Sequence, residues 1–402
     1  MRILIDATWI GNMYGTKVMH GGYRVTNEFV KRLGNYGNHE FFLTSSNYLV
    51  NSVENLKRYN ETEVRGANVS VNARSLAWLD DPSYKSMYAR MSRYIPFPYI
   101  YPFISRPALN KIDIFHAPVD AIPGIIRRNH KIKKYFTALD LIPLVRPDLS
   151  NVFQEYTKVL YDSLTPDINI LAISECTKRD IIKYRPDIKP DKIKVIYLAA
   201  DEKLFYFMKD KEAAQNSIAD IGLKGKKYFL TVNLMARYKN VEFVIENFIK
   251  FIADNNISDL HLVMIGQNRE INYKEFIAQK YGHADKLIMI DYVEDGKLAS
   301  IYNNALAFLY MSRYEGFGLP ILEAMQCGAP VICSNAASIP EVSGDAAILI
   351  DPTDGPAFID AMVNVYSSDS MRSSLIGKGI HQAAKFSWDK YAAEVVQAYE
   401  QM

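Results

Sequence analysis

The chain has few cysteines and almost no net charge. Its 402 residues include three cysteines, an odd number without C-x-x-C spacing: Cys176, Cys327 and Cys333. This pattern disfavours a disulfide scaffold and a zinc site, so we expect a protein of the reducing cytoplasm. Lysine and arginine outnumber aspartate and glutamate by 47 − 45 = 2. Such a balance gives no indication of nucleic acid as a partner.

Targeting signals and long apolar runs are also missing. The sequence begins MRILIDATWI, without the basic start, long apolar core and small-residue cleavage site of a signal peptide, and we interpret it as a first buried strand. No uninterrupted apolar run approaches the ~20 residues that a membrane-spanning helix requires. Any membrane association is therefore expected to be peripheral, at the inner face of the membrane.

Recognisable metal ligands are a further absence. The sequence has no Asp-x-Asp pair and no clustered motif of histidines and carboxylates. We therefore expect a mechanism without metal, in which protein cations and helix dipoles stabilise developing negative charge.

Short apolar runs alternate with helical patterns along the chain. Alternation of this kind predicts parallel sheets covered by helices on both faces, and the number of runs predicts two such sheets. The expected strands are 3–6, 41–44, 112–116, 134–138, 169–173, 194–197, 228–232, 261–265, 287–289, 305–310, 331–333 and 347–350. The predicted class is α/β with two doubly wound domains, whose ligands bind beyond the carboxyl ends of the strands.

A polar segment at 199–207 marks the expected break between the domains. We predict an N-terminal domain over 1–200, a second domain over 201–385 and a terminal helix over 386–402. The terminal helix has apolar residues at helical spacing, including Trp388, Val395 and Tyr399.

The stretch from Pro82 to Lys111 differs in composition. It carries five basic and seven aromatic residues and no acidic one. Basic side chains bind anionic head groups and tyrosines settle at the water–hydrocarbon boundary, so one interpretation is a peripheral membrane or lipid-acceptor patch. The alternative is a proline-broken helix and loop whose aromatic residues fill the N-terminal core. A second basic run, 127–134, would add to the patch if it lay on the same face.

The most informative segment is EGFGLPILEAMQCGAPVICS, in which Glu315 and Glu323 stand at E-x7-E spacing. Glycines and an early proline predict a loop that opens onto a helix N-terminus. Such a terminus attracts an anion, while the two carboxylates accept hydrogen bonds from hydroxyl groups. Hydroxyls beside a phosphate suggest a nucleotide sugar. The alternative is an ordinary β-loop-α connection with solvated glutamates.

With its flanks, the stretch 298–352 resembles the C-terminal signature of the retaining glycosyltransferases called glycosyl transferases group 1. The resemblance implies the GT-B architecture: two Rossmann-like domains facing across a cleft, and a C-terminal helix that crosses back to the N-terminal domain. It also implies that Glu315 contacts the donor sugar and Glu323 binds the ribose. The backbone N–H groups of Phe317, Gly318 and Leu319 would face the sugar and diphosphate.

A second segment, NLMARYKN from Asn233 to Asn240, resembles the loop in which this family places a lysine against the diphosphate. Lys239 occupies that position. The family usually has glycine where this chain has Asn233, and often arginine where it has Leu234. Arg237 is our candidate for the second positive charge.

TALDLIPL, from Thr137 to Leu144, resembles the family's T-x-H-D-L-x-P-L segment, whose histidine reaches the donor sugar near its sixth carbon. Here that position is Leu139, which cannot make the hydrogen bond. Three explanations stay open: a 6-deoxy donor, another residue that makes the contact, or lost activity. Asp140 is assigned to the cleft wall or acceptor side, and His116 is a substitute candidate on the acceptor side.

Near the N-terminus, the segment HGGYR leads into a helix. Paired glycines before a helix permit close approach of a phosphate or acceptor. The family places a glycine-rich loop here against the donor phosphate, which implicates Gly21 and Gly22. His20 and Arg24 flank them as acceptor-side candidates.

Taken together, these features predict a metal-independent, retaining glycosyltransferase. It would move a hexose or 6-deoxyhexose from a nucleoside-diphosphate sugar to a glycan or lipid-linked glycan, in surface polysaccharide biosynthesis, with no cofactor besides the donor. Two alternatives remain open: a nucleotide-sugar epimerase of the same fold, and an inactive donor-binding partner subunit of a transferase.

Overall fold

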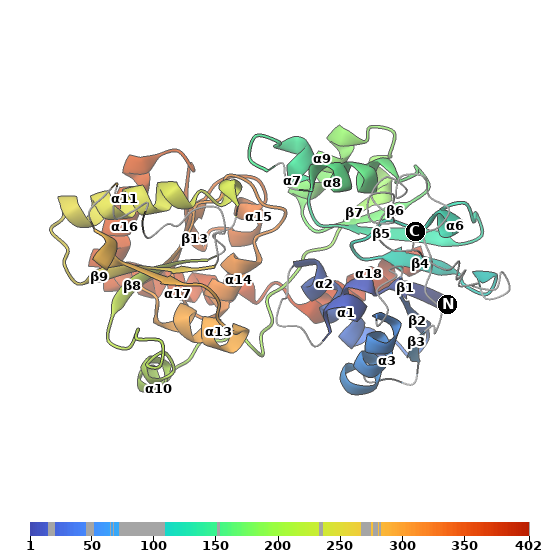
Figure 1. Ribbon diagram of the computed structural model, residues 1–402, viewed down its shortest axis with the longest axis horizontal. Coiled ribbons are helices and arrows are strands. Elements are labelled where there is room, and N and C mark those ends of the chain that lie inside the picture. Colours follow the sequence, from blue (N-terminus) through green and yellow to red (C-terminus); the bar gives the residue numbers. More distant parts are fainter. Residues whose placement is uncertain are drawn as a thin grey trace. The chain divides into compact units, whose positions relative to one another are not determined.

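The computed structural model describes residues 1–14, 21–45, 52–64, 66, 68–71, 109–150, 153–232, 236–266, 275, 280 and 283–401. The chain forms two compact units (Figure 1), each built around one parallel sheet. Unit 1 comprises Met1–Leu144, Phe153–Tyr197 and Trp388–Met402, and unit 2 comprises Val145–Val152 and Leu198–Ser387. The predicted α/β class with two doubly wound sheets is confirmed.

Unit 1 contains a parallel sheet of seven strands in its described part, in the order β3-β2-β1-β4-β5-β6-β7. The strands are β1 (Arg2–Asp6), β2 (Glu40–Thr44), β3 (Val69–Val71), β4 (Ile114–Ala117), β5 (Lys133–Ala138), β6 (Asn169–Ala172) and β7 (Ile193–Val195). The helices are α1 (Thr8–Met13), α2 (Gly21–Arg32), η1 (Leu33–Asn35), α3 (Ser52–Glu63), α6 (Gly124–Arg127), α7 (Ile142–Val145), α8 (Gln154–Asp162), α9 (Glu175–Tyr184), η2 (Pro190–Lys192) and α18 (Trp388–Gln401). The prediction missed β3, because three residues at a sheet edge are too few to show a pattern.

Unit 2 contains a parallel sheet of six strands in its described part, in the order β10-β9-β8-β11-β12-β13. The strands are β8 (Lys227–Val232), β9 (Leu260–Ile265), β10 (Leu287–Ile290), β11 (Ala307–Tyr310), β12 (Val331–Ser334) and β13 (Ala347–Ile350). The helices are α10 (Lys211–Asn216), η3 (Arg237–Lys239), α11 (Val241–Asp254), η4 (Ala284–Lys286), α13 (Asp295–Asn304), α14 (Leu319–Gln326), α15 (Ile339–Ser343), α16 (Gly355–Ser367) and α17 (Asp369–Ala383).

Helices cover both faces of the unit 2 sheet. In Figure 1, α11 and α16 lie on one face and α13, α14 and α17 on the other. Helix α11 shows why: its buried residues, from Val241 through Val244 and Ile245 to Phe248 and Ile252, recur at helical spacing and form one apolar stripe. The strands are apolar on both sides, since each side packs against helices.

The terminal helix α18 belongs to unit 1 and is held there by buried hydrogen bonds. Tyr399 Oη lies 2.6 Å from Nδ1 of His116 on β4. Tyr135 on β5 donates its hydroxyl to the carbonyl of Ala398 at 2.9 Å. These groups are shielded from water, so each bond contributes about 1 kcal/mol and fixes the register of the helix on the sheet.

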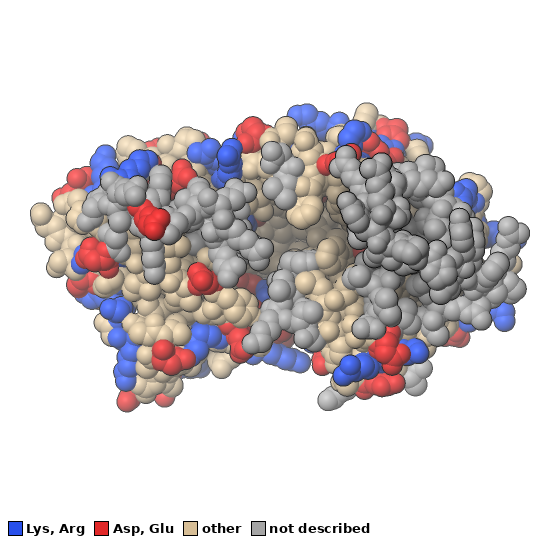
Figure 2. All heavy atoms as spheres, viewed as in Figure 1, with Lys and Arg blue, Asp and Glu red and all other residues tan. Residues whose placement is uncertain are grey.

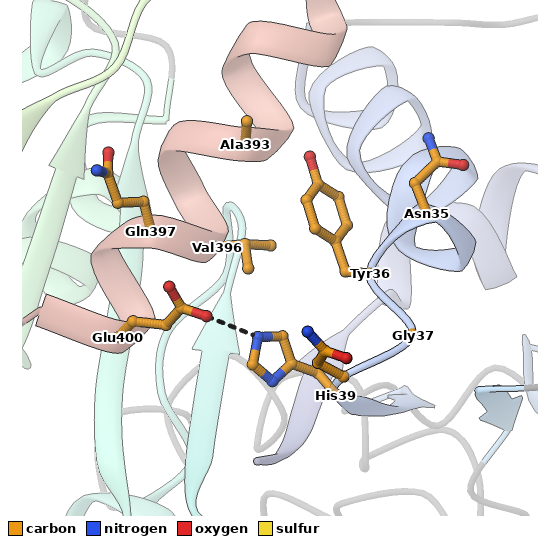
Figure 3. A pocket seen from close by; sticks show the side chains of 9 residues that line it. Asn35, Tyr36, Gly37, His39, Ala393, Val396, Gln397 and Glu400 are labelled. Atoms are coloured by element: carbon orange, nitrogen blue, oxygen red, sulfur yellow. Dashed lines mark hydrogen bonds and ion pairs between the residues drawn. The ribbon is translucent and has the colours of Figure 1, made fainter.

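Two further side-chain contacts reinforce this attachment. Arg32 on α2 donates to Asp389 on α18 at 2.6 Å. At the other end of α18, Glu400 lies 3.1 Å from His39, which directly precedes β2. Figure 3 shows this second contact, with Tyr36 and Val396 facing the same small pocket. The pocket lies at the amino ends of the strands, away from the edge where doubly wound sheets bind ligands.

On the face seen in Figure 2, blue and red side chains are interspersed over the described surface. Within the described residues, no helix has the length and apolar character to cross a bilayer. Of the predicted membrane patch, residues 82–108 lie outside the described part of the chain.

Candidate functional site

The strand order of unit 2 places two loops side by side. The chain runs outward from β8 to β10 and then returns to add β11, β12 and β13 on the other side of β8. The order therefore reverses between β8 and β11, and such a switch point is where open α/β sheets bind ligands. Lys239 follows β8 and Glu315 follows β11. A backbone hydrogen bond of 2.7 Å, from Arg313 to the carbonyl of Tyr238, joins the two loops.

The switch point brings the predicted lysine and glutamate into direct contact. Lys239 Nζ donates to Glu315 Oε1 at 2.7 Å, although the two residues are 76 positions apart in the sequence. The same ammonium group lies 3.2 Å from the hydroxyl of Tyr310, the last residue of β11. The two charged side chains are only 13% and 9% exposed. This shielding strengthens the attraction between the two charges relative to a solvent-exposed pair.

Two aromatic rings complete the surroundings of the lysine. Nζ of Lys239 lies 5.1 Å from the ring centre of Tyr238 and 5.3 Å from that of Tyr310. Both distances are within the range of cation–π attraction. Burial, followed by the charge and hydrogen bonding of Glu315, raises the pKa of Tyr310 well above its usual value. Its hydroxyl therefore keeps its proton and can donate and accept at once.

The segment after Glu315 is held rigidly in front of α14. Ser338 Oγ lies 2.9 Å from the carbonyl of Glu315 and 2.8 Å from that of Phe317. Gly318 has φ 114°, in the region that disfavours residues with a Cβ. Helix α14 begins at Leu319 with a proline in its first turn, as predicted. The N-terminus of α14 thus follows Glu315 by four residues and carries partial positive charge.

Glu323 lies one turn into α14 and is 4% exposed. Burial, together with the negative charge of Glu323, raises the pKa of the Cys327 thiol. Phe317 is buried as well, against Phe386. The backbone N–H groups of Phe317, Gly318 and Leu319 were predicted to face the sugar and diphosphate. These residues directly follow the Glu315 loop and lead into α14, and their contact with a donor stays a prediction.

Arg237 opens η3 and is exposed. Among the described residues, no carboxylate forms an ion pair with it. Asn240 next to Lys239 has φ 58° and donates its side-chain amide to the carbonyl of Pro352 at 2.8 Å. This bond fixes the chain where η3 turns into α11. Asn233 and Leu234, the two departures from the family pattern, lie outside the described residues.

In unit 1, Leu139 and Asp140 follow directly after β5. The carbonyl of Leu139 accepts a hydrogen bond from Thr177 at 3.2 Å, and its side chain is partly exposed. Asp140 Oδ1 accepts a hydrogen bond of 3.1 Å from the backbone N–H of Ile142, the first residue of α7. The hydroxyl of Tyr161 donates to the Asp140 carbonyl. Both residues lie at the carboxyl end of the sheet, where ligands of such sheets bind.

The structure does not support the acceptor-side role predicted for His116. Its side chain is fully buried, with Nδ1 at 2.6 Å from Tyr399 Oη and Nε2 at 2.8 Å from Thr137 Oγ1. Burial lowers its pKa to about 3, so the imidazole is neutral at physiological pH. With both nitrogens engaged in the core, this histidine joins the sheet to α18.

The paired glycines stand at the start of α2, where Gly21 is exposed. A Cβ on Gly21 would meet no atom of the described residues within 4 Å, so packing against those residues does not require glycine there. Gly22 is buried and its carbonyl accepts from Thr26 at 2.9 Å. Arg24 is half-buried on the same helix. His20 lies outside the described residues.

Three features of the two sites were not predicted. Sequence analysis treated Tyr310 only as part of an apolar strand. Its position at the carboxyl end of that strand, where ligands bind, could have indicated a role in the site. Asp6 and Asp120 end β1 and follow β4, the two strands at which the order of the unit 1 sheet reverses. Asp6 is 3% exposed and accepts from Thr8, whereas Asp120 accepts from the Tyr156 hydroxyl. Burial and then the charge of Asp6 raise the pKa of Asp120 to about 7.

A cluster suited to a metal ion would need at least three histidine, cysteine or carboxylate side chains. The described ranges contain no such group.

The chain is similar in sequence to known glycosyltransferases. Among curated proteins, O-antigen chain mannosyltransferase B of Escherichia coli is 30% identical over 244 residues. The match covers 60% of this chain and 63% of that relative. The chain thus spans less than two thirds of the relative's length.

Solved structures resemble the whole chain at low identity. Sucrose-phosphate synthase from Thermosynechococcus elongatus matches with a TM-score of 0.71 and 17% identity, over 100% of this chain and 98% of the other. Anabaena HepE, solved with UDP-glucose, matches with a TM-score of 0.68 and 12% identity over all of both chains. These likenesses show the shared GT-B fold. Residues 214–382, the part of the chain that carries Lys239 and Glu315, match the model of the family glycosyl transferases group 1, the family that the sequence resemblance indicated.

Proposed function

We propose that the protein is a retaining glycosyltransferase of surface polysaccharide biosynthesis. It moves a hexose or 6-deoxyhexose from a nucleoside-diphosphate sugar to a glycan or lipid-linked glycan acceptor. The reaction needs no metal and no cofactor besides the donor, and takes place in the cytoplasm or at the inner face of the membrane. The relative named an O-antigen chain mannosyltransferase supports this pathway and makes mannose the first sugar to test.

One observation carries the proposal: the shielded contact between Lys239 and Glu315 at the switch point of unit 2. A cation, a carboxylate and a helix N-terminus are there within one site. The cation and the helix N-terminus suit a diphosphate, and the carboxylate suits sugar hydroxyls. The HepE structure with UDP-glucose shows that a protein of this fold holds such a donor.

The reaction would follow a front-face course. The bond between the anomeric carbon and the diphosphate oxygen breaks, and the acceptor oxygen forms its bond from the same face. The acceptor's proton passes to the departing phosphate oxygen, so charge and atoms balance. Lys239, Arg237 and the N-terminus of α14 stabilise the leaving charge, which is greatest in the transition state.

The remaining residues bind and orient. Glu315 accepts hydrogen bonds from the sugar and Glu323 from the ribose. From unit 1, we assign Asp140 to the acceptor, Leu139 to the sugar, and Gly21 and Gly22 to the phosphate. Exclusion of water is required, since water would otherwise hydrolyse the donor.

A panel of nucleoside-diphosphate sugars tests the proposal directly. The purified protein is incubated with GDP-mannose, GDP-fucose, UDP-glucose, UDP-galactose and dTDP-rhamnose, and release of the nucleoside diphosphate is measured with and without chelator. We expect slow hydrolysis of one donor, unchanged in chelator. Glu323→Ala should raise the dissociation constant of that donor about tenfold, because a charge-assisted bond contributes about 1.5 to 3 kcal/mol.

Other outcomes favour the alternatives. Conversion of the donor into an epimer, without any need for acceptor, would identify an epimerase. Binding of a donor without hydrolysis or transfer would indicate an inactive partner subunit. Activity that chelator abolishes and magnesium restores would contradict the metal-independent mechanism.

A further inference from the structure

The ammonium group of Lys239 contacts Glu315 and Tyr310 at the same time. Lys239 donates to Glu315 at 2.7 Å and to the Tyr310 hydroxyl at 3.2 Å. The Tyr310 hydroxyl and the Glu315 carboxylate therefore contact the same ammonium group, and the negative charge of Glu315 helps to raise the pKa of Tyr310. Tyr310 and Glu315 are both buried, so water does not readily replace either contact with Lys239.

This geometry creates a difficulty for donor binding. If Lys239 is to neutralise a diphosphate, its ammonium group must weaken or leave its contact with Glu315. A buried carboxylate that loses its cation is strongly destabilised unless other donors satisfy it. The cost would be highest for a ligand that takes the lysine and offers Glu315 nothing in return.

We propose that Tyr310 is a positioning residue that keeps Glu315 hydrogen-bonded while Lys239 moves from the carboxylate to the diphosphate. The inference rests on the proposed function and deepens it. The tyrosine ring stays beside the ammonium group in either state, and the hydroxyl supplies the donor that Glu315 would otherwise lack. Tyr310 thus acts through its two neighbours and touches neither the sugar nor the phosphate.

The proposal predicts different effects on the affinities of two ligands that bind the same site. A nucleoside-diphosphate sugar brings its own hydroxyl groups to Glu315. A nucleoside diphosphate, the product, brings none, so in that complex Tyr310 is the donor that remains. Loss of the hydroxyl should therefore weaken binding of the product more than binding of the donor substrate. Simple loosening of the fold would weaken both ligands equally.

Tyr310→Phe tests this, because it removes the hydroxyl and keeps the ring. Calorimetry would compare GDP with GDP-mannose, or UDP with UDP-glucose if the panel selects the uridine nucleotide. We expect affinity for the nucleoside diphosphate to fall about tenfold and affinity for the sugar nucleotide to fall about threefold or less.

Tyr228→Phe is the matched control. Tyr228 lies on β8 of the same sheet, is fully buried, and donates its hydroxyl to the carbonyl of Ile301 at 2.7 Å. The control also loses one buried hydrogen bond, but at a site that does not contact Lys239. It should leave the ratio of the two affinities unchanged.

A double-mutant cycle with Glu315→Gln completes the test. A neutral amide is far less costly to leave without a cation, so Tyr310→Phe should change nucleoside-diphosphate affinity less than about twofold in that background. Equal losses for both ligands, or an unchanged effect in the Glu315→Gln background, would overturn the proposal. If the parent binds no sugar nucleotide at all, the proposed function fails instead, and the two failures are distinct.

Discussion

At the scale of single residues, Lys239 has two roles, one in the stability of the fold and one in the proposed reaction. Its ammonium group neutralises Glu315, and in the proposed mechanism it also stabilises the leaving diphosphate. Removing one partner of a shielded pair leaves the other uncompensated, so a simple deletion mixes a stability effect with a catalytic one. Separating the two requires a second substitution at Glu315.

We expect Lys239→Ala to lower kcat by about a hundredfold or more and the unfolding free energy by about 1 to 3 kcal/mol. Adding Glu315→Gln removes the unpaired charge and should restore most of the stability without restoring turnover. Thermal unfolding and donor hydrolysis measure the two effects. A double variant with parental activity would show that Lys239 has no catalytic role.

Leu139 offers a prediction about donor choice. An apolar side chain near the sixth carbon favours a methyl group and leaves a hydroxyl unpaired, at a cost of about 1 to 3 kcal/mol. Leu139→His should therefore shift relative kcat/KM toward the 6-hydroxylated sugar by about ten- to a hundredfold. Competition between GDP-mannose and its 6-deoxy analogue measures this ratio. A parent enzyme that prefers mannose would contradict the role of Leu139 and leave the transferase proposal intact.

At the scale of elements, the loop before α14 depends on the conformation of one residue. Gly318 has φ 114°, and a Cβ there would lie 3.3 Å from Ile321 Cδ1. The backbone angle is the larger obstacle, since side-chain atoms of Ile321 can shift but the left-handed region disfavours any residue with a Cβ.

Gly318→Ala should lower the unfolding free energy by about 1 to 3 kcal/mol and weaken donor binding, because Glu315 precedes the strained residue by three positions. Gly296→Ala is the control. Gly296 lies in the first turn of α13, and a Cβ there meets no described atom within 4 Å. That variant should be about 0.5 to 1 kcal/mol more stable than the parent. Chemical denaturation compares the two; equal effects would remove backbone strain as the explanation.

At the scale of the whole molecule, the pH dependence of stability reports on the unit 1 sheet. The pKa of Asp120 is about 7 in the fold, above its ordinary value of 3.8. Below the ordinary value the carboxyl is protonated in both states. Between the two values the unfolded chain releases the proton first, so stability is lost as the pH rises toward 7.

Asp120→Asn should therefore match the parent in stability near pH 4 and exceed it above pH 7. We expect a gain of about 1 to 2 kcal/mol, less than the full shift implies because the carboxyl is partly exposed. The difference in unfolding free energy between variant and parent should grow from about pH 4 to pH 7 and then stay constant. Denaturant titrations at several pH values measure it, and a gain independent of pH would assign the effect to packing instead.

The positions of the strands and of the main motif were predictable because they depend on local patterns. Twelve expected strands lie within two residues of β1, β2 and β4 to β13. The Gly-Pro segment after Glu315 also opens onto α14 at the expected place. Burial of both sheet faces makes each strand a short apolar run, which is visible in the sequence without its neighbours.

The sequence by itself therefore determined the class of fold, the family and the loop that bears Glu315. Only the tertiary structure decided which distant side chains meet. The order of strands places Lys239 against a carboxylate 76 positions away and puts the Tyr310 hydroxyl beside both. It also buries the His116 side chain of β4 against α18, where sequence analysis expected a ligand contact. Strand order is set by non-local packing, so a side chain's partners follow from the completed sheet, whereas its helix or strand follows from its near neighbours in sequence.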